Sequence, residues 1–316
     1  MKKNNLDPVG TLSIGNVVTT GTILYKSNFK RYFQVSVRAN GWLLATVGAS
    51  IGTIAICSVL FGLTNSWLAP TLVGLGSSGL IFYLWAKYLT DRAVICRLAY
   101  QELIDVPETV SVATQQVIPR TWGFLRLYLL VSLCMLVVTI ASGIILSIVL
   151  IIVFAAAIYG LKATPTDPFI SVSIVLLTVV LSFLWILVII RYYAYWFVAE
   201  LPLAIEPTKS AIFSFSRSRQ LNEDATRRVG LIITIAFLIT LPINVIDSVP
   251  SFVGQTISNP ILSPDPSAQL IGGALVFAGF LLSLVSELLI MPFWQVIKAI
   301  VYYDLRNRQE GSDLTI

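Results

Sequence analysis

The stretch FLRLYLLVSLCMLVVTIASGIILSIVLIIVFAAAIYGL, residues 124–161, contains one basic residue and no acidic residue. As one α-helix it would be about 57 Å long, whereas the hydrocarbon core of a bilayer is about 30 Å thick. The run is therefore either one long membrane helix that tilts or projects beyond the lipid, or two spans that meet near Gly143.

The distribution of basic residues decides between these two readings. The other apolar runs of spanning length are 41–63, 67–89, 169–199, 229–249 and 268–303. With six spans, the segments 1–40, 90–123, 200–228 and the C-terminal tail share one side of the membrane. When residues near the span ends are counted with the nearest side, every Lys and Arg except Lys162 falls on that side. Basic segments stay in the cytoplasm, so we expect one helix in 124–161 and both termini inside. A seventh span would move 200–228 and the tail outside.

The composition supports the same fold. Hydrophobic residues make up 56% of the 316 residues and charged residues 12%, and the mean hydropathy is +0.85. Soluble domains carry about 25% charged residues. We therefore predict an all-α integral membrane protein, a six-helix bundle with short amphipathic cytoplasmic helices. It divides into an N-terminal amphipathic segment (1–40), a membrane domain (41–303) and a cytoplasmic tail (304–316).

The residue types present favour no catalytic or metal chemistry. The chain has no histidine, which is the commonest general base and metal ligand. Cys57, Cys96 and Cys134 form no CxxC pair, and two of them lie inside apolar runs. No nucleotide-binding, hydrolase or metalloprotease motif occurs. We therefore expect no catalytic residue, no metal and no cofactor, and we interpret the cysteines as small apolar side chains.

Three cytoplasmic segments share one plan, a short helix followed by a basic or aromatic turn and then a span. They precede the first, third and fifth spans. The apolar faces expected for the second and third are Val110, Ala113 and Val117 in 107–118, and Ala211, Ile212 and Phe215 in 208–221. These helices could lie in the headgroup plane, with the basic residues Arg217, Arg219, Arg227 and Arg228 facing anionic lipid. The segments indicate either a true threefold repeat or the ordinary composition of cytoplasmic loops.

Glu287 is an acidic residue that lies well inside a predicted span, in LLSLVSELLIMPFW. A carboxylate in lipid costs several kcal/mol unless it is paired or neutral. Counting back from the tail places it near the middle of the hydrocarbon. It is either a proton or substrate site, or a packing group hydrogen-bonded to serines such as Ser142 or Ser283.

Glycines mark places where helices could approach closely. Gly48 and Gly52 have GxxxG spacing, and Gly272, Gly273 and Gly279 lie in the last span. Such contacts could form within the bundle or in a dimer seam, and a six-span bundle favours the first.

The tail alternates aromatic and charged residues in VYYDLRNRQEG, 301–311. Tyr302 and Tyr303 are placed where interfacial aromatic residues are expected. The i,i+4 spacing predicts ion pairs of Asp304 with Arg308 and of Arg306 with Glu310 on a solvated helix end, and Gly311 is suited to end that helix.

The stretch YYDLRNRQEGSDL, 302–314, resembles the C-terminal signature of a bacterial family, the membrane domain of glycerophosphoryl diester phosphodiesterase. The stretch AIFSFSRSRQL, 211–221, is similar to a segment that precedes a span in that family. The resemblance implies six helices and an inner-membrane location. It does not imply phosphodiesterase activity, because catalysis in that family belongs to a separate soluble domain.

These observations favour a non-enzymatic accessory or organising protein of a bacterial cytoplasmic membrane. Its expected partners are membrane lipids and other membrane proteins, and not nucleic acid. A transporter of lipid or small molecules centred on Glu287 is the competing hypothesis.

Overall fold

The computed structural model describes residues 13–156, 168–206, 210–259 and 265–312, which form helices and no strand. The elements are α1 (Ile14–Ser27), α2 (Phe29–Thr64), α3 (Leu68–Leu103), α4 (Val110–Val117), η1 (Ile118–Arg120), α5 (Thr121–Ala155), α6 (Pro168–Trp196), α7 (Glu200–Ile205), α8 (Ala211–Asn222), α9 (Thr226–Ile257) and α10 (Pro266–Ser312). In the described part of the chain, six helices are long and apolar enough to cross a membrane. The predicted all-α membrane fold is confirmed.

Each predicted span coincides for most of its length with one long helix, and most of these helices extend beyond the apolar run at one end or both. α2, for example, begins at Phe29 and not at Gly41. The expectation of one helix in the longest run is confirmed, because α5 continues without a break through Gly143 to Ala155. The last residues of that run, 157–161, lie outside the described residues.

The order of the elements follows the predicted threefold plan, because a short helix precedes each of the hairpins α2–α3, α5–α6 and α9–α10. The short helices α1, α4 and α8 start in the same way. Ser13, Thr109 and Ser210 are their N-caps, and each side-chain oxygen accepts a hydrogen bond from the backbone N–H three residues later. Such a cap satisfies one of the N–H groups that a helix start leaves unpaired.

The three short helices also bury the same positions. The fourth and eighth residues after each N-cap are buried, and these are Val17 and Gly21, Ala113 and Val117, and Ser214 and Ser218. The i,i+4 spacing places each pair on one helix face. A Cβ atom on Gly21 would collide with the side chain of Ile297, so α1 packs closely on α10.

This register changes two expectations about the short helices. The apolar face of α4 packs against protein, since Ala113 and Val117 are fully buried in the core and Val110 packs on it. The expected apolar face of α8 is wrong in part, because Ile212 is 71% exposed. Serines occupy the buried face of α8, and apolarity alone could not identify that face.

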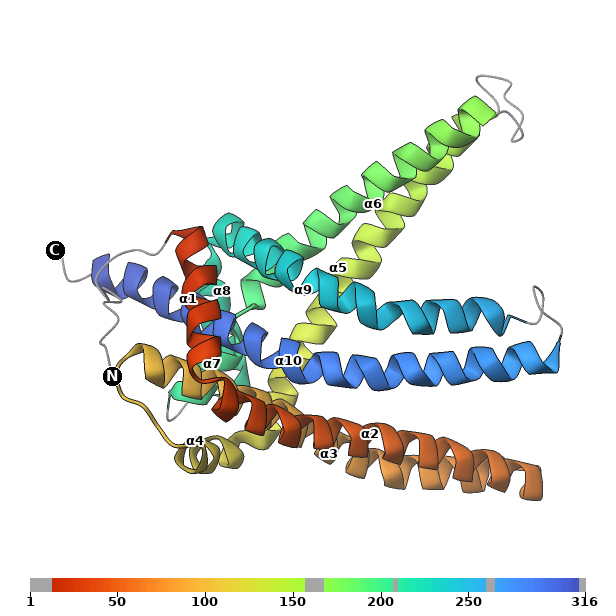
Figure 1. Cartoon of the computed structure of the whole chain (residues 1–316), viewed down its shortest axis with the longest axis horizontal. Helices are drawn as coiled ribbons and strands as arrows, with labels where there is room; N and C mark the ends of the chain where they lie inside the picture. Colours follow the sequence, from red (N-terminus) through yellow and green to blue (C-terminus); the bar gives the residue numbers. More distant parts are fainter. Residues whose placement is uncertain (1–12, 157–167, 207–209, 260–264, 313–316) are drawn as a thin grey trace.

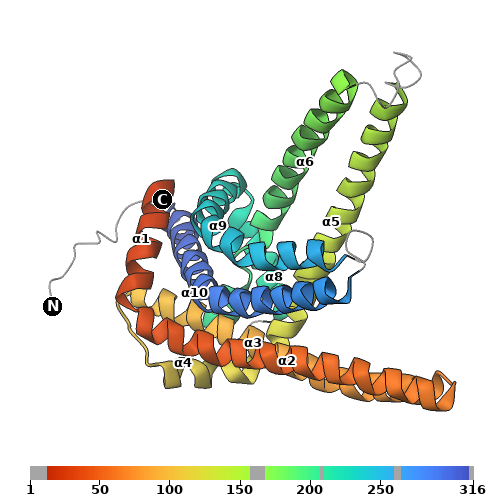
Figure 2. The same ribbon diagram turned by 45° about the vertical axis from the view of Figure 1, so that its right-hand side comes forward.

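Figures 1 and 2 show the three hairpins diverging from a common region. We call this region the base. It comprises α1, α4, η1, α7, α8 and the adjoining ends of the six long helices, and we call the hairpins beyond it the arms. The buried apolar residues gather in the base, chiefly in 86–100 of α3, 194–204 of α6 and α7, and 290–305 of α10.

The arms differ in how closely their helices approach. In the α9–α10 arm, a Cβ atom on Gly254 would lie 2.6 Å from the Gly272 carbonyl oxygen, so backbone meets backbone there. Gly279 is equally tight against Ser251. In the α5–α6 arm, the indole N–H of Trp185 donates a hydrogen bond of 2.9 Å to Ser142 Oγ. Towards the end of this arm, a cavity of about 520 Å³ lies between the two helices.

Close packing of glycines within the bundle is therefore confirmed for two positions and wrong for three, and a dimer seam at those three stays a prediction. Gly272 and Gly279 pack against a neighbouring helix. Cβ atoms on Gly48, Gly52 and Gly273 would meet no atom within 4 Å, so these glycines face open space in the described part of the molecule.

Candidate functional site

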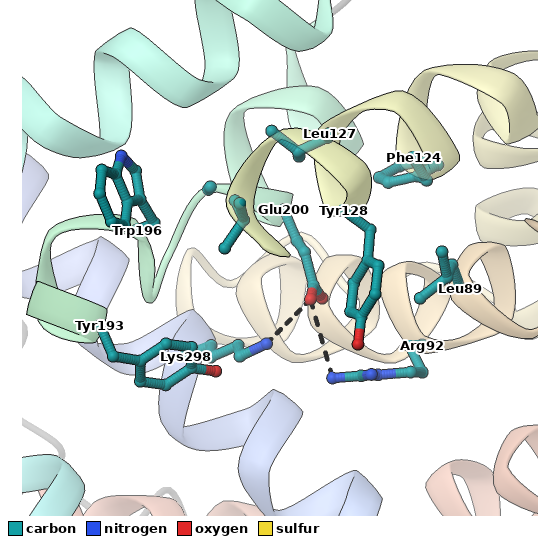
Figure 3. Close-up of a pocket in the computed structure, with 11 residues that line it drawn as sticks. Leu89, Arg92, Phe124, Leu127, Tyr128, Tyr193, Trp196, Glu200 and Lys298 are labelled. Carbon is teal, nitrogen blue, oxygen red and sulfur yellow. Dashed lines mark hydrogen bonds and ion pairs between the residues drawn. The ribbon is translucent and has the colours of Figure 1, made fainter. Parts of the chain in front are cut away.

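Three charged side chains meet in the base, one from each unit of the threefold plan. Arg92 lies on α3, Glu200 begins α7, and Lys298 lies on α10 (Figure 3). Lys298 Nζ donates to Glu200 Oε1 at 2.9 Å, and Arg92 Nη2 lies 3.8 Å from the same oxygen. The helix ends that converge in the base thus bring together residues far apart in sequence.

Gln295 contacts both Arg92 and Glu200, and it lies about one helical turn before Lys298 on α10. When its amide oxygen is oriented towards Arg92, that oxygen accepts from Arg92 Nε and Nη2 at 2.9 and 3.0 Å. The amide nitrogen then donates to Glu200 Oε2 at 3.2 Å. The side chain of Gln295 is completely buried, so this network fixes the positions of Arg92 and Glu200.

Burial of the Lys298 ammonium needs compensation, because its side chain is only 5% exposed. Glu200 supplies the opposite charge, and the Phe197 ring lies 5.8 Å from Nζ. Arg92 is stacked in a similar way over Tyr88, at 5.6 Å. Arg92 and Glu200 are about one-fifth exposed, so solvent or a ligand can reach both of them.

A cavity of about 70 Å³ opens beside these charges. Its wall is mostly apolar and aromatic, and it is formed by Leu89, Phe124, Leu127, Tyr128, Val131, Tyr193, Trp196 and Ala199 together with Arg92, Glu200 and Lys298 (Figure 3). This volume holds a few water molecules or one small polar group. A few polar groups converging in an apolar cavity are typical of a small-molecule site.

Glu287 lies near this cluster but is arranged differently from the expectation. The hydroxyl of Tyr88 donates to Glu287 Oε1 at 3.2 Å. The expected serine partners are wrong, because Ser283 Oγ donates to the Gly279 carbonyl and Ser142 Oγ to the Val138 carbonyl. Ser142 and Ser283 lie at similar positions along their predicted spans, so the sequence made them plausible partners. The side chain that bonds to Glu287 comes from α3 instead.

The depth of Glu287 in the membrane stays a prediction. Glu287 lies about 32 Å along α10 from Pro266, and Tyr88 lies about 30 Å along α3 from Leu68, at 1.5 Å per residue. The two side chains therefore lie at similar distances from the starts of their helices.

The tail residues belong to the core of the base. Tyr302 is 1% exposed, so it is not an interfacial aromatic residue, and Tyr303 packs against the same core. The hydroxyl of Tyr302 donates to Glu206 at 3.4 Å, and Arg306 donates to the Tyr100 hydroxyl at 3.0 Å. The tail is thus packed against α3 and the segment after α7.

The ion pairs expected in the tail are partly observed. Asp304 pairs with Arg308 at 3.0 Å, as the i,i+4 spacing predicts. The predicted pair of Arg306 with Glu310 lies outside the described side chains. The expectation that Gly311 ends the helix is wrong, because α10 continues to Ser312.

The four expected membrane-surface arginines are not equivalent. Arg219 and Arg227 are exposed, and Arg217 is half-buried. Arg228 pairs with the buried carboxylate of Asp304 at 3.1 Å, so it also ties α9 to α10. No group of metal-ligating side chains occurs among the described residues.

No local pattern in the sequence singles out Arg92, Glu200, Gln295 or Lys298 as members of one site. One signal was present, because Lys298 and Gln295 interrupt the apolar run that precedes the tail. Their partners lie about a hundred residues away in the other units, and no local spacing indicates that they meet.

Comparison of the chain with protein-family models, with curated proteins and with solved structures found no match. The geometry and the sequence are therefore the observations from which a function can be proposed.

Proposed function

We propose that this chain is a non-enzymatic, multi-pass protein of a bacterial cytoplasmic membrane that organises lipids and partner membrane proteins around its arms. The observation that supports this most directly is the contrast in packing. The most apolar windows of the spans in α2, α5 and α6 bury none of their residues within the described structure, against 28% in α9. Such helices present their side chains to lipid or to another membrane protein.

The proposed orientation places the base and both termini in the cytoplasm. The described Lys and Arg residues lie in the base or near the base ends of the arms, where cytoplasmic basic residues are expected. The resemblance of the tail to the membrane domain of glycerophosphoryl diester phosphodiesterase supports an inner-membrane location. That resemblance also supports a non-catalytic role, because catalysis in that family belongs to a separate domain.

Orientation is tested with two exposed serines, Ser66 between α2 and α3 at an arm tip and Ser216 on α8 in the base. Each is replaced by cysteine in a chain whose three native cysteines are replaced by serine or alanine. A membrane-impermeant maleimide should label Ser66→Cys in intact cells and Ser216→Cys only after permeabilisation. The reverse pattern would contradict the orientation.

The organising role is tested with the native half-buried cysteines of two arms, Cys57 on α2 and Cys134 on α5. If the arms face lipid or protein, both thiols should resist a charged methanethiosulfonate reagent and react with an apolar maleimide. Buried Cys96 should resist both reagents until the protein unfolds. Rapid reaction of Cys57 and Cys134 with the charged reagent would reveal a water-filled route and contradict an organising role.

A transporter remains the second candidate because of Glu287. Its carboxylate is half-buried and accepts a hydrogen bond from the hydroxyl of Tyr88. Proteoliposomes carrying a luminal pH dye provide the test. A proton-coupled carrier would change luminal pH at a rate that Glu287→Gln abolishes and that Tyr88→Phe alters less. The organising role predicts no protein-dependent change.

A further inference from the structure

We propose that the cavity beside Arg92 binds the phosphodiester of an anionic membrane phospholipid, whose acyl chains lie on the apolar surfaces of α5 and α6. This inference rests on the proposed lipid-organising function and names the lipid class and the site.

The donors of Arg92 provide the first argument. Its Nε and Nη2 atoms contact Gln295 and Glu200. Its Nη1 atom has no hydrogen-bond partner among the described residues, although Arg92 lines the cavity. A guanidinium that is held rigidly through one edge and presents its remaining N–H groups is suited to a phosphate oxygen.

The charge of the site provides the second argument. Among the residues that line the cavity, Arg92 and Lys298 contribute two positive charges and Glu200 one negative charge, so the cavity wall carries one net positive charge. The Glu287 carboxylate also interacts with Arg92 but does not line the cavity. A phosphodiester carries one negative charge and balances the charge of the cavity wall in surroundings that are largely apolar. Glu200 is already bonded to Lys298, and its exposed part can accept a hydrogen bond from a headgroup hydroxyl. In Figure 3 the hydroxyl end of Tyr128 points toward Arg92, where it can donate to the same phosphate.

The depth of the cavity provides the third argument. Arg92 lies about 36 Å along α3 from Leu68, where that helix begins. With Leu68 at the far edge of the hydrocarbon, this distance exceeds the 30 Å of the hydrocarbon by about the thickness of a headgroup layer. This placement of α3 puts the cavity at the level of the lipid phosphates.

The size and the surroundings of the cavity favour a lipid over a free phosphate ion. About 70 Å³ accepts one phosphate group and excludes the chains of a lipid. Farther along the same two helices, Leu133 on α5 and Leu187 on α6 are exposed apolar side chains. A lipid would cover them with its acyl chains, whereas inorganic phosphate would leave them bare.

The test uses the full chain in nanodiscs of phosphatidylcholine that contain a minor fraction of phosphatidylglycerol. Lipids that remain bound after transfer to mild detergent are identified by native mass spectrometry. Wild-type protein should retain one phosphatidylglycerol well above its share of the nanodisc. Arg92→Gln should weaken this retention about tenfold or more, because a charge-assisted hydrogen bond is lost. Arg126→Gln is the matched control, since Arg126 is an exposed arginine on α5 that does not line the cavity.

Tyr128→Phe keeps the inference testable if Arg92→Gln does not fold. Tyr128 is partly exposed, so loss of its hydroxyl should leave folding intact and reduce retention of phosphatidylglycerol severalfold. Equal losses for Arg126→Gln and Arg92→Gln would reduce the effect to general surface charge and overturn the inference. Retention unaffected in both Arg92→Gln and Tyr128→Phe would overturn it as well.

Two further measurements distinguish other ligands. Equal retention of phosphatidylethanolamine would show a zwitterionic lipid site and overturn the anionic class. Displacement of bound lipid by inorganic phosphate would show a soluble-anion site. Failure of this inference differs from failure of the proposed function. Arms that resist the charged thiol reagent without any bound phosphatidylglycerol refute the inference alone, whereas reactive arms with bound phosphatidylglycerol refute the organising role alone.

Discussion

The base and the arms differ in the kind of surface that they bury within the chain. The base buries charges in specific pairs, such as Arg97, which donates to Glu108 through two nitrogens at 2.7 and 2.8 Å and to the Ala204 carbonyl at 2.8 Å. The arms contain little polar chemistry, and the two helices of the α5–α6 arm make much less contact with each other than those of the other two arms. Stability should therefore depend strongly on single residues in the base and weakly on single residues in the α5–α6 arm.

The largest effect is expected at Arg97. Arg97→Gln leaves the Glu108 carboxylate and the Ala204 carbonyl buried without their partner, which should reduce the free energy of unfolding by about 3–5 kcal/mol. Unfolding of the purified protein in mixed micelles measures this. Arg219→Gln, an exposed position on α8, is the control and should change stability by no more than about 0.5 kcal/mol. A similar small change at Arg97 would remove the proposed contrast between base and arms.

The second effect lies in the tight arm. Gly272→Ala would place a Cβ atom 2.6 Å from the Gly254 carbonyl oxygen and 2.7 Å from the Ser258 amide nitrogen. Backbone atoms cannot move aside as a side chain can, so α9 and α10 must separate, at a cost of about 1–3 kcal/mol. The adjacent Gly273→Ala is a matched control because its Cβ atom meets nothing within 4 Å. Equal losses of stability at the two glycines would mean that the backbones of α9 and α10 are not in contact at Gly272.

These two glycines also show what the sequence could and could not predict. The lengths of the apolar runs predicted the six spans, because span length is fixed by the bilayer and is read locally. Close packing between helices is not a local property. Gly272 and Gly273 are adjacent in the sequence, but Gly272 meets the backbone of α9 and Gly273 meets nothing within 4 Å. The N-caps of α1, α4 and α8 are local signals of the repeat.

The candidate site could not be predicted from local sequence patterns for the same reason. Arg92, Glu200 and Lys298 each look like an ordinary charge at the end of a span, and the pairing of units determines that they meet. At Tyr302 the local sequence predicted a definite location, and that prediction was wrong. A tyrosine after an apolar run is typical of an interface, but the ends of the long helices in this chain form a protein core.

The third effect concerns the open α5–α6 arm, where one hydrogen bond joins Trp185 to Ser142. Trp185→Phe removes the donor and keeps an aromatic ring, and the expected loss is about 0.6 kcal/mol, the average for hydrogen bonds between membrane helices. A double-mutant cycle with Ser142→Ala measures the coupling directly. A coupling above about 2 kcal/mol would show that this arm is held as specifically as the base.

The smallest effect is expected at Gly48, on the α2–α3 arm. Gly48 and Gly52 have the spacing of a helix-packing motif, but a Cβ atom at either position meets nothing within 4 Å in the described part of the chain. Gly48→Ala should therefore change the stability of the isolated monomer by no more than about 0.5 kcal/mol, and in the stabilising direction, because alanine is the better helix former. The measurement is made in dilute detergent, where copies are separated, and is repeated in nanodiscs loaded with two copies. A loss that appears only at two copies per disc would mean that a second chain covers this face, whereas a loss in the monomer would mean that the arm is packed more closely than these contacts indicate.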